Sequence, residues 1–242
     1  MRFLDWYYKV ISATDLRAIA NRHSIEIGWI VEAGCHDGTD TLILLQEFPN
    51  SKIVAFEPDP ISRSKADERF KTLPKEQVEL HPFGLSNEES AKFLNYVDNL
   101  KGNGTSSISE SGIDGVQTVT LDAFRSFPSN GGLLWLDVEG HAVNALLGMV
   151  ETLKGIDLAK IEIQMHQKSS QRKQDYLEVL GMMAERGLIP THVPLHPGFF
   201  GDIYFVRREL VGTSTRIRAY LLTFQMKMLH GLIYPLLGKP SK

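Results

Sequence analysis

The stretch VEAGCHDGTD, residues 31–40, decides how this chain folds. It ends the short aliphatic run GWIVEAG at 28–34, carries two glycines, Gly34 and Gly38, and leads into a predicted helix over about 39–48. Short runs rich in aliphatic and β-branched residues are typical of central strands that are covered on both faces. The order therefore predicts a strand, a glycine turn and a helix N-terminus, the first unit of a parallel α/β sheet.

Outward from this unit, short apolar runs alternate with helix-like stretches along most of the chain. Further strands are predicted at 52–57, 77–84, 116–122, 133–140 and 158–166, and longer helices at about 61–71 and 171–186. The last two runs, LIPTHVPLH and GDIYFVR, flank a Pro-Gly pair and predict an antiparallel hairpin at the sheet edge. Residues 85–115 interrupt the rhythm, and their segment GNGTSS at 102–107 predicts a loop with a functional role.

The composition fits one globular domain with an ample core, since 43% of the 242 residues are hydrophobic and 23% are charged. The single cysteine, Cys35, excludes an intrachain disulfide and the zinc spacings that need two or more thiolates. The sequence holds no HExxH or GxSxG motif for zinc-protease or serine-hydrolase chemistry. Asp5 and Lys9 interrupt the N-terminal apolar segment and speak against a signal peptide, so we expect a cytoplasmic protein.

The net charge of −3 is unevenly distributed. Residues 211–242 hold five Lys/Arg and no acidic residue, which leaves 21 basic against 29 acidic residues, a net charge of −8, for residues 1–210. With a pI near 6.2, the chain is not expected to bind nucleic acid, because such proteins usually present a basic surface. We predict an N-terminal helical extension over 1–27, a main domain over 28–210 and a basic amphipathic C-terminal helix over 211–242.

The predicted C-terminal helix is largely apolar. Its polar residues Arg216, Thr223, Lys227 and His230 fall on one narrow stripe, and the rest is too apolar to leave in water. Charges in mid-run and Pro235 speak against a membrane-spanning segment. Two alternatives stay open for residues 213–237: a helix that packs on the domain or on a second subunit in a homo-oligomer, or a peripheral helix at the inner membrane surface.

Polar groups follow the first two predicted strands, where a nucleotide would bind. Glycines let the backbone approach a ligand, and the N–H groups at a helix start favour polar or anionic groups. Glu57, at the end of the second strand, can accept hydrogen bonds from both hydroxyls of a ribose, which predicts an adenosine ligand. Cys35 and His36 stand where the dinucleotide fingerprint GxGxxG needs glycine, and the P-loop motif is missing, so a pyrophosphate ligand is disfavoured.

Glu32 followed by the GxxxG of Gly34 and Gly38, with Glu57 in the next strand, resembles the first motifs of S-adenosylmethionine-dependent methyltransferases. Further runs are AFEPDP at 55–60, GNGTSSIS at 102–109, VTLDAF at 119–124 and LLWLDVEG at 133–140. In this order, over residues 28–206, they resemble the FkbM family. The resemblance implies an α/β, Rossmann-like class I methyltransferase fold, with a mostly parallel seven-stranded sheet and an antiparallel C-terminal hairpin. It also implies S-adenosylmethionine as cofactor and a sugar, glycan or natural-product hydroxyl as acceptor.

The same resemblance assigns residues to the site. The turn at the methionine and ribose end would comprise Glu32, Gly34, Cys35, His36, Asp37, Gly38 and Thr39; the ribose would lie at Glu57, Pro58 and Asp59, and the adenine at Gly84, Leu85 and Ser86. Ser106 and Ser107 would cover the cofactor or meet the acceptor. The sequence departs from the family where DxEG is followed by a small residue and a second glutamate, because His141 and Ala142 occupy those two positions.

Methyl transfer to oxygen requires aligned reactants and a group that accepts the hydroxyl proton. Asp137, at the end of a central strand, would lie near the cofactor's sulfonium, and Glu139 would point to the same side if the strand continued. His141 and His166 are further candidate bases. Paired acids could instead bind a divalent cation, and helix capping is the structural alternative for both acids. Glu162 is expected to be buried and paired, and Asp202 to have a surface or turn role.

Two alternatives to a methyltransferase stay open. The missing second glutamate at Ala142 permits a non-catalytic nucleotide- or metabolite-binding module on the same fold. An NAD-dependent sugar oxidoreductase is opposed by the absent dinucleotide fingerprint. The sequence does not identify the acceptor or decide which of the candidate bases acts.

Overall fold

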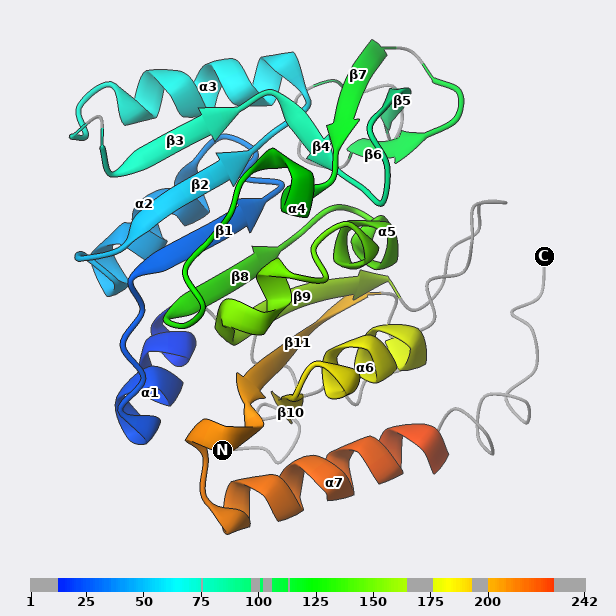
Figure 1. Cartoon of the computed structure of the whole chain (residues 1–242). Coiled ribbons are helices and arrows are strands. Elements are labelled where there is room, and N and C mark those ends of the chain that lie inside the picture. The colour runs from blue at the N-terminus through cyan, green and yellow to red at the C-terminus, as the bar shows by residue number, and fades with distance from the viewer. Residues whose placement is uncertain are drawn as a thin grey trace, which may run out of the picture.

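Two β-sheets and the helices around them form the computed structural model, which describes residues 13–74, 76–96, 101, 106–112, 114–164, 176–192 and 200–228 (Figure 1). The larger sheet has seven strands in the order β10-β11-β9-β8-β1-β2-β3. They are β1 (Trp29–Ala33), β2 (Lys52–Phe56), β3 (Val78–His81), β8 (Gly132–Leu136), β9 (Ile156–Gln164), β10 (Leu188–His192) and β11 (Phe200–Arg207). Neighbours are parallel, except that β11 is antiparallel to both β9 and β10. The predicted sheet and C-terminal hairpin are therefore confirmed.

Helices cover both faces of this sheet because successive strand residues point to opposite sides. In β1, Val31 lies in a buried cluster with α5 and α6, and Ile30 lies in a second cluster with α1, α2 and α3. The helices are α1 (Ala13–His23), α2 (Thr39–Glu47), α3 (Pro60–Phe70), α4 (Leu121–Phe124), α5 (Ala142–Leu147), α6 (Tyr176–Glu185) and α7 (Thr213–Met228), with 3-10 turns at η2 (Thr152–Gly155) and η3 (Arg208–Leu210). Every residue of β1 and β8 is buried, which explains their nearly unbroken apolar sequences.

The two ends of the described chain pack on the sheet. Leu16 and Ala20 of α1 are completely buried, so the N-terminal part contributes to the core from Ala13 onward. Ala219 of α7 is buried in the same cluster. Within the ranges that the structure describes, no helix has both the length and the apolar character needed to cross a membrane.

A second sheet lies beyond the carboxyl ends of β2 and β3 (Figure 1). Its order is β4-β7-β5-β6, with β4 (Phe83–Leu85), β5 (Ser90–Tyr96), β6 (Ser106–Ser109) and β7 (Asp114–Val119). The single strand predicted over 77–84 is wrong, because Pro82, which has no N–H to donate, separates β3 from β4. After Pro82 the chain leaves the large sheet and pairs with β7 instead.

The loop predicted for GNGTSS is wrong at Ser106 and Ser107, which lie in β6; residues 102–105 are outside the described part. The small sheet has its own buried cluster of Leu94, Tyr96, Ile108 and Val116. Apolar residues at alternate positions, such as Leu94 and Tyr96, are the signature of a half-buried strand. β6 itself reads SSIS, with Ile108 as its one apolar residue, so the sequence of this strand shows no such alternation.

Candidate active site

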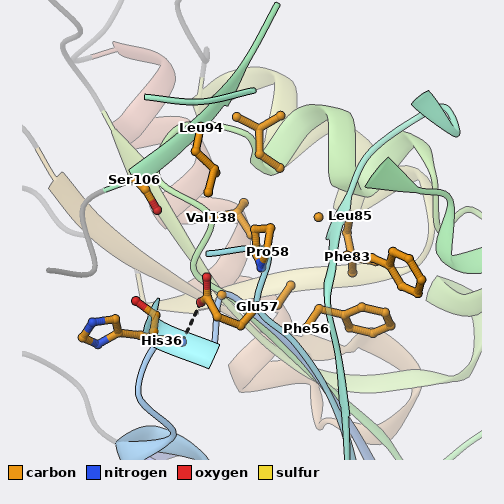
Figure 2. Close-up of a pocket in the computed structure, with 14 residues that line it drawn as sticks. His36, Phe56, Glu57, Pro58, Phe83, Leu85, Leu94, Ser106 and Val138 are labelled. Atoms are coloured by element: carbon orange, nitrogen blue, oxygen red, sulfur yellow. Dashed lines mark hydrogen bonds between the residues drawn. The ribbon is translucent and has the colours of Figure 1, made fainter. Parts of the chain in front are cut away.

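The turn after β1 lies at the point of the large sheet where ligands are expected. β1 is hydrogen-bonded to β2 on one side and to β8 on the other. The chain passes from β1 to β2 in one direction along the sheet and from β8 to β9 in the opposite direction. In open α/β sheets, ligands bind in the crevice at such a switch point. A pocket opens there, lined by Ala33, Gly34, His36, Phe56, Glu57, Pro58, Ser62, Phe83, Gly84, Leu85, Leu94, Ser106, Ile108 and Val138 (Figure 2).

Gly34 lets the turn pack directly on the neighbouring strand. Its φ is +82°, and a Cβ at this position would lie 1.8 Å from the Asp137 carbonyl oxygen. The Asp137 N–H in turn donates to the carbonyl of Ala33 at 2.9 Å. Gly38, with φ +80°, has the Phe70 ring 2.7 Å from its ideal Cβ. The positive φ favours glycine at both positions, and at Gly34 the close approach to the neighbouring backbone requires it as well.

Glu57 holds the turn and the start of α3 together. Its Oε2 accepts a hydrogen bond from the His36 N–H at 2.8 Å (Figure 2). Its Oε1 accepts one from the Asp59 N–H, also at 2.8 Å. Burial raises the pKa of Glu57 to about 7, although the two backbone hydrogen bonds oppose the shift. A carboxylate oxygen has two lone pairs, so each oxygen can accept a second hydrogen bond from the pocket side.

The other predicted ribose residues have separate roles. Pro58 lines the pocket. Asp59 caps α3, because its side chain accepts from the Ile61 N–H and from the Ser62 hydroxyl, each at 3.0 Å. Pro60 follows as the first helical residue, where its missing N–H costs nothing.

The small sheet forms the apolar wall of the pocket. Gly84 and Leu85 come from β4, Leu94 from β5, and Ser106 and Ile108 from β6. Ser106 is thus in the pocket lining, whereas its predicted partner Ser107 is not. Ser86, predicted beside adenine, is also not among the lining residues; its hydroxyl lies 3.1 Å from Nε2 of His141.

Glu32 lies beneath the turn rather than in the pocket lining. Its Oε2 accepts from the Thr41 hydroxyl at 2.7 Å, while its Oε1 is buried and has no hydrogen-bond partner among the described residues. Burial raises the pKa of Glu32 to about 8. Cys35 is buried as well, and burial raises the pKa of its thiol, so it is not a thiolate at neutral pH.

The remaining turn residues are held by local hydrogen bonds. Oδ1 of Asp37 accepts from the Thr39 N–H at 3.1 Å and from the Thr39 hydroxyl at 2.7 Å. Oδ2 of Asp37 accepts from Arg69 of α3 at 2.7 Å. His36 contributes its backbone N–H to Glu57 and has a left-handed φ of 50°. The Asp37 and Thr39 side chains thus support the turn.

Three carboxyl groups gather just after the end of β8 and in β9. One oxygen each of Asp137, Glu139 and Glu162 lies within 4.8 Å of the others in the described part of the chain. Glu139 reaches this group by a turn and not by continuation of the strand, because β8 ends at Leu136 and Glu139 has a φ of 43°. The predicted juxtaposition of Asp137 and Glu139 is thus observed, but its predicted strand geometry is wrong.

Asp137 and Glu162 form a hydrogen-bonded pair of acids. Burial raises the pKa of Glu162, and its hydrogen bond with Asp137 raises it further. Burial alone would raise the pKa of Asp137 too, but the hydrogen bond from Glu162 and the Lys160 ammonium hold it below its ordinary value. At neutral pH, Asp137 is therefore the carboxylate and Glu162 the protonated partner. Glu162 is paired, as predicted, but it is half-buried rather than buried.

Lys160 lies in the candidate site, although the sequence pattern did not predict it as a site residue. It is 5% exposed, and its Nζ lies 2.9 Å from Oδ2 of Asp137, 3.1 Å from Oδ1 of Asp202 and 4.6 Å from the centroid of the Trp135 ring. The surface role predicted for Asp202 is wrong, because the antiparallel pairing of β11 brings Asp202 beside Lys160. A lysine inside a central strand was the available signal, since a buried ammonium needs acidic partners.

The two histidines predicted as candidate bases are His141 and His166. His141 is 9% exposed and lies against Ser86. Burial lowers its pKa to about 4, so it is neutral at physiological pH. The cluster of Asp137, Glu139 and Glu162 does not include it. His166 lies outside the described residues.

The Methyltransferase FkbM domain matches residues 32–189, which is more than half of the chain. The chain belongs to the FkbM methyltransferase family. The FkbM domain thus includes the turn, the pocket lining and the carboxyl cluster, and it ends before β11 and α7.

More distant similarities accompany this match. Methyltransferase 1 of Beauveria bassiana (strain ARSEF 2860) is 27% identical over 143 residues, covering 56% of this chain and 54% of that protein. The match thus spans about half the length of that relative. An rRNA methylase from Streptococcus thermophilus has a TM-score of 0.48 at 15% identity and covers 82% and 98% of the two chains. Magnesium protoporphyrin IX methyltransferase (ChlM) from Synechocystis PCC 6803, with bound SAM, has a TM-score of 0.45 at 11% identity and covers 81% and 77%.

Proposed function

We propose that this FkbM domain is an S-adenosylmethionine-dependent O-methyltransferase, with a hydroxyl of a sugar, glycan or natural product as acceptor. The observation that carries the proposal is the Glu57 carboxylate, fixed by two backbone amides in the wall of a largely apolar pocket. A cytoplasmic location is part of this proposal, because the single cysteine needs no oxidising compartment.

The pocket suits an adenosine group. Glu57 has lone pairs free to accept the two ribose hydroxyls, and bidentate hydrogen bonds to a carboxylate are among the stronger ones in proteins. Phe83, Leu85 and Leu94 supply apolar surface for a purine ring. The backbone turn from Gly34 to Gly38 leads from this pocket toward α2, where a polar or charged end of the cofactor would meet the helix N-terminus.

The carboxyl cluster suits proton acceptance. S-adenosylmethionine supplies an electrophilic methyl group when it is bound. Asp137 is the ionised member of its pair with Glu162, so it can take the proton of an acceptor hydroxyl. Lys160 fixes the position of the Asp137 carboxylate through its 2.9 Å contact. His141, neutral and directed at Ser86, is assigned no proton-transfer role.

A divalent cation is a second possibility at the same cluster. Asp137, Glu139 and Glu162 offer the oxygen ligands that hard cations such as Mg²⁺ prefer. A bound cation would displace the proton that Glu162 holds, and it would lower the pKa of an acceptor hydroxyl. Methyl transfer assayed with EDTA and with added Mg²⁺ decides between the cation and Asp137 acting alone as the base.

Calorimetric titration with S-adenosylmethionine, S-adenosylhomocysteine and NAD tests the cofactor. Micromolar binding of the first two and none of NAD is expected, and Glu57→Gln should weaken both affinities by roughly tenfold or more. Glu68→Gln, an exposed change on α3, is the matched control. Binding of NAD alone would overturn the proposal.

A panel of sugar, glycan and natural-product hydroxyl acceptors, scored by formation of S-adenosylhomocysteine, tests turnover. Product formation with any of them supports the enzyme. Cofactor binding without product from the whole panel favours the non-catalytic module on the same fold.

A further inference from the structure

Helix α7 buries one side and leaves a continuous apolar stripe exposed on the other. Ala219 is 2% exposed and Leu222 packs against the core, so the helix is docked on the domain. Ile217, Tyr220, Leu221 and Phe224 are nevertheless 55%, 62%, 56% and 62% exposed. Their spacing of three, four and seven residues places them on one face of the helix. Packing on the domain therefore accounts for one side of this helix and leaves the apolar residues of the other side exposed.

Basic residues border the exposed stripe on both sides. At about 100° per residue, Arg216 and Arg218 project on opposite sides of the line through Ile217 and Phe224. Arg218 is exposed, whereas Arg216 is half-buried and its Nε donates to the Val211 carbonyl at 3.0 Å. No acidic residue occurs in 211–242, whereas residues 1–210 carry a net charge of −8. The nearest acid before the helix, Glu209, is paired with Arg208 at 3.3 Å. Positive charge is therefore concentrated where the apolar side chains are exposed.

This combination fits an anionic lipid surface. Apolar side chains can insert at the boundary of headgroups and acyl chains, with Tyr220 suited to the interface by its hydroxyl. Arg218, the exposed arginine beside the stripe, can extend its charged end to a lipid phosphate, and each basic residue near an anionic leaflet adds to the affinity. The absence of a spanning helix among the described residues agrees with a helix that lies in the plane of the membrane.

A second copy of this chain fits the same face less well. In a twofold dimer the same patch meets itself, so Arg216 and Arg218 of one copy would approach those of the other. α7 offers no acidic partner to either pair, and like charges across an interface oppose association.

We infer that α7 is a peripheral membrane-binding helix that attaches this protein to anionic bilayers through Ile217, Tyr220, Leu221 and Phe224. The inference does not depend on methyl transfer, and α7 lies outside the matched FkbM domain.

Flotation of the full chain with vesicles tests the inference. Phosphatidylcholine vesicles and vesicles with about one third phosphatidylglycerol are compared at low and high salt. Binding is expected to the anionic vesicles, to fall with salt, and to drop roughly tenfold or more for Arg218→Glu and for the double change Leu221→Ser with Phe224→Ser.

Matched controls lie on other helices. Ile61→Ser with Leu147→Ser changes two exposed apolar residues, at 42% and 43% exposure, and Lys71→Glu reverses an exposed charge just after α3. Both should bind vesicles like the unchanged chain. Loss of binding in the controls, equal binding to neutral vesicles, or no binding at all would overturn the inference. A dimer by light scattering that only the α7 changes dissociate, without vesicle binding, would assign the stripe to a second copy instead.

Discussion

The Nζ of Lys160 lies 2.9 Å from Oδ2 of Asp137, so a lysine in the interior of β9 neutralises the carboxylate that follows β8. The parallel register explains the contact, because Lys160 pairs with Trp135, two residues before Asp137. Asp202 meets the same ammonium from the antiparallel strand β11. Removal of one member from such a buried group leaves charge without compensation, which is costly.

Lys160→Met should therefore lower the free energy of unfolding by about 3–5 kcal/mol. Urea denaturation followed by circular dichroism measures the change. Lys154→Met is the matched control, because Lys154 is an exposed lysine and its loss should change stability by no more than about 0.5 kcal/mol. Adding Asp202→Asn to Lys160→Met should recover part of the loss. Equal stability of the two lysine variants would mean that the ion pairs contribute nothing.

Gly34→Ala should lower the free energy of unfolding by about 2–4 kcal/mol, because the new Cβ would overlap the Asp137 carbonyl at a φ of +82°. Gly28→Ala is the control, since nothing lies within 4 Å of an ideal Cβ there. Thermal denaturation of the two variants in parallel makes the comparison. Similar melting temperatures would show that β1 and β8 can separate at this point without cost.

The part of the fold that follows from local pattern was predictable. β1, the glycine turn and α2 have a sequence that favours a single arrangement, and Glu57 falls at the end of β2 by simple counting. Lys160 was not predictable in the same way, because its partner Asp202 arrives through the register of an antiparallel strand far along the chain. The contact between His141 and Ser86 likewise depends on tertiary packing across 55 residues.

Glu32 should make stability fall as the pH rises. Its folded-state pKa of about 8 is above the ordinary value of 4.5, so the folded protein keeps a proton that the unfolded chain releases. Between about pH 5 and 8, raising the pH therefore favours unfolding, by at most about 1.4 kcal/mol per pH unit for one group. Urea denaturation across this range should give a flatter profile for Glu32→Gln than for the unchanged chain.

The comparison with Glu32→Gln isolates this group, because Glu57 and Glu162 also have raised pKa values and contribute to the slope of both proteins. Glu68→Gln, at an exposed position of α3, should leave the profile unchanged. A slope that is the same in Glu32→Gln and the unchanged chain would contradict a protonated Glu32 in the folded state.

Asp137→Asn should lower turnover by about 10²–10⁴-fold while the affinity for S-adenosylmethionine changes little, because the amide cannot accept the hydroxyl proton. Formation of S-adenosylhomocysteine with a productive acceptor measures the first quantity, and calorimetry the second. Asp202→Asn is the control, since it also removes one partner of Lys160 but leaves Asp137 ionised and held by the same ammonium. Turnover should therefore be lost in Asp137→Asn and largely retained in Asp202→Asn. Equal losses in the two variants would assign Asp137 to positioning the cluster rather than to proton transfer.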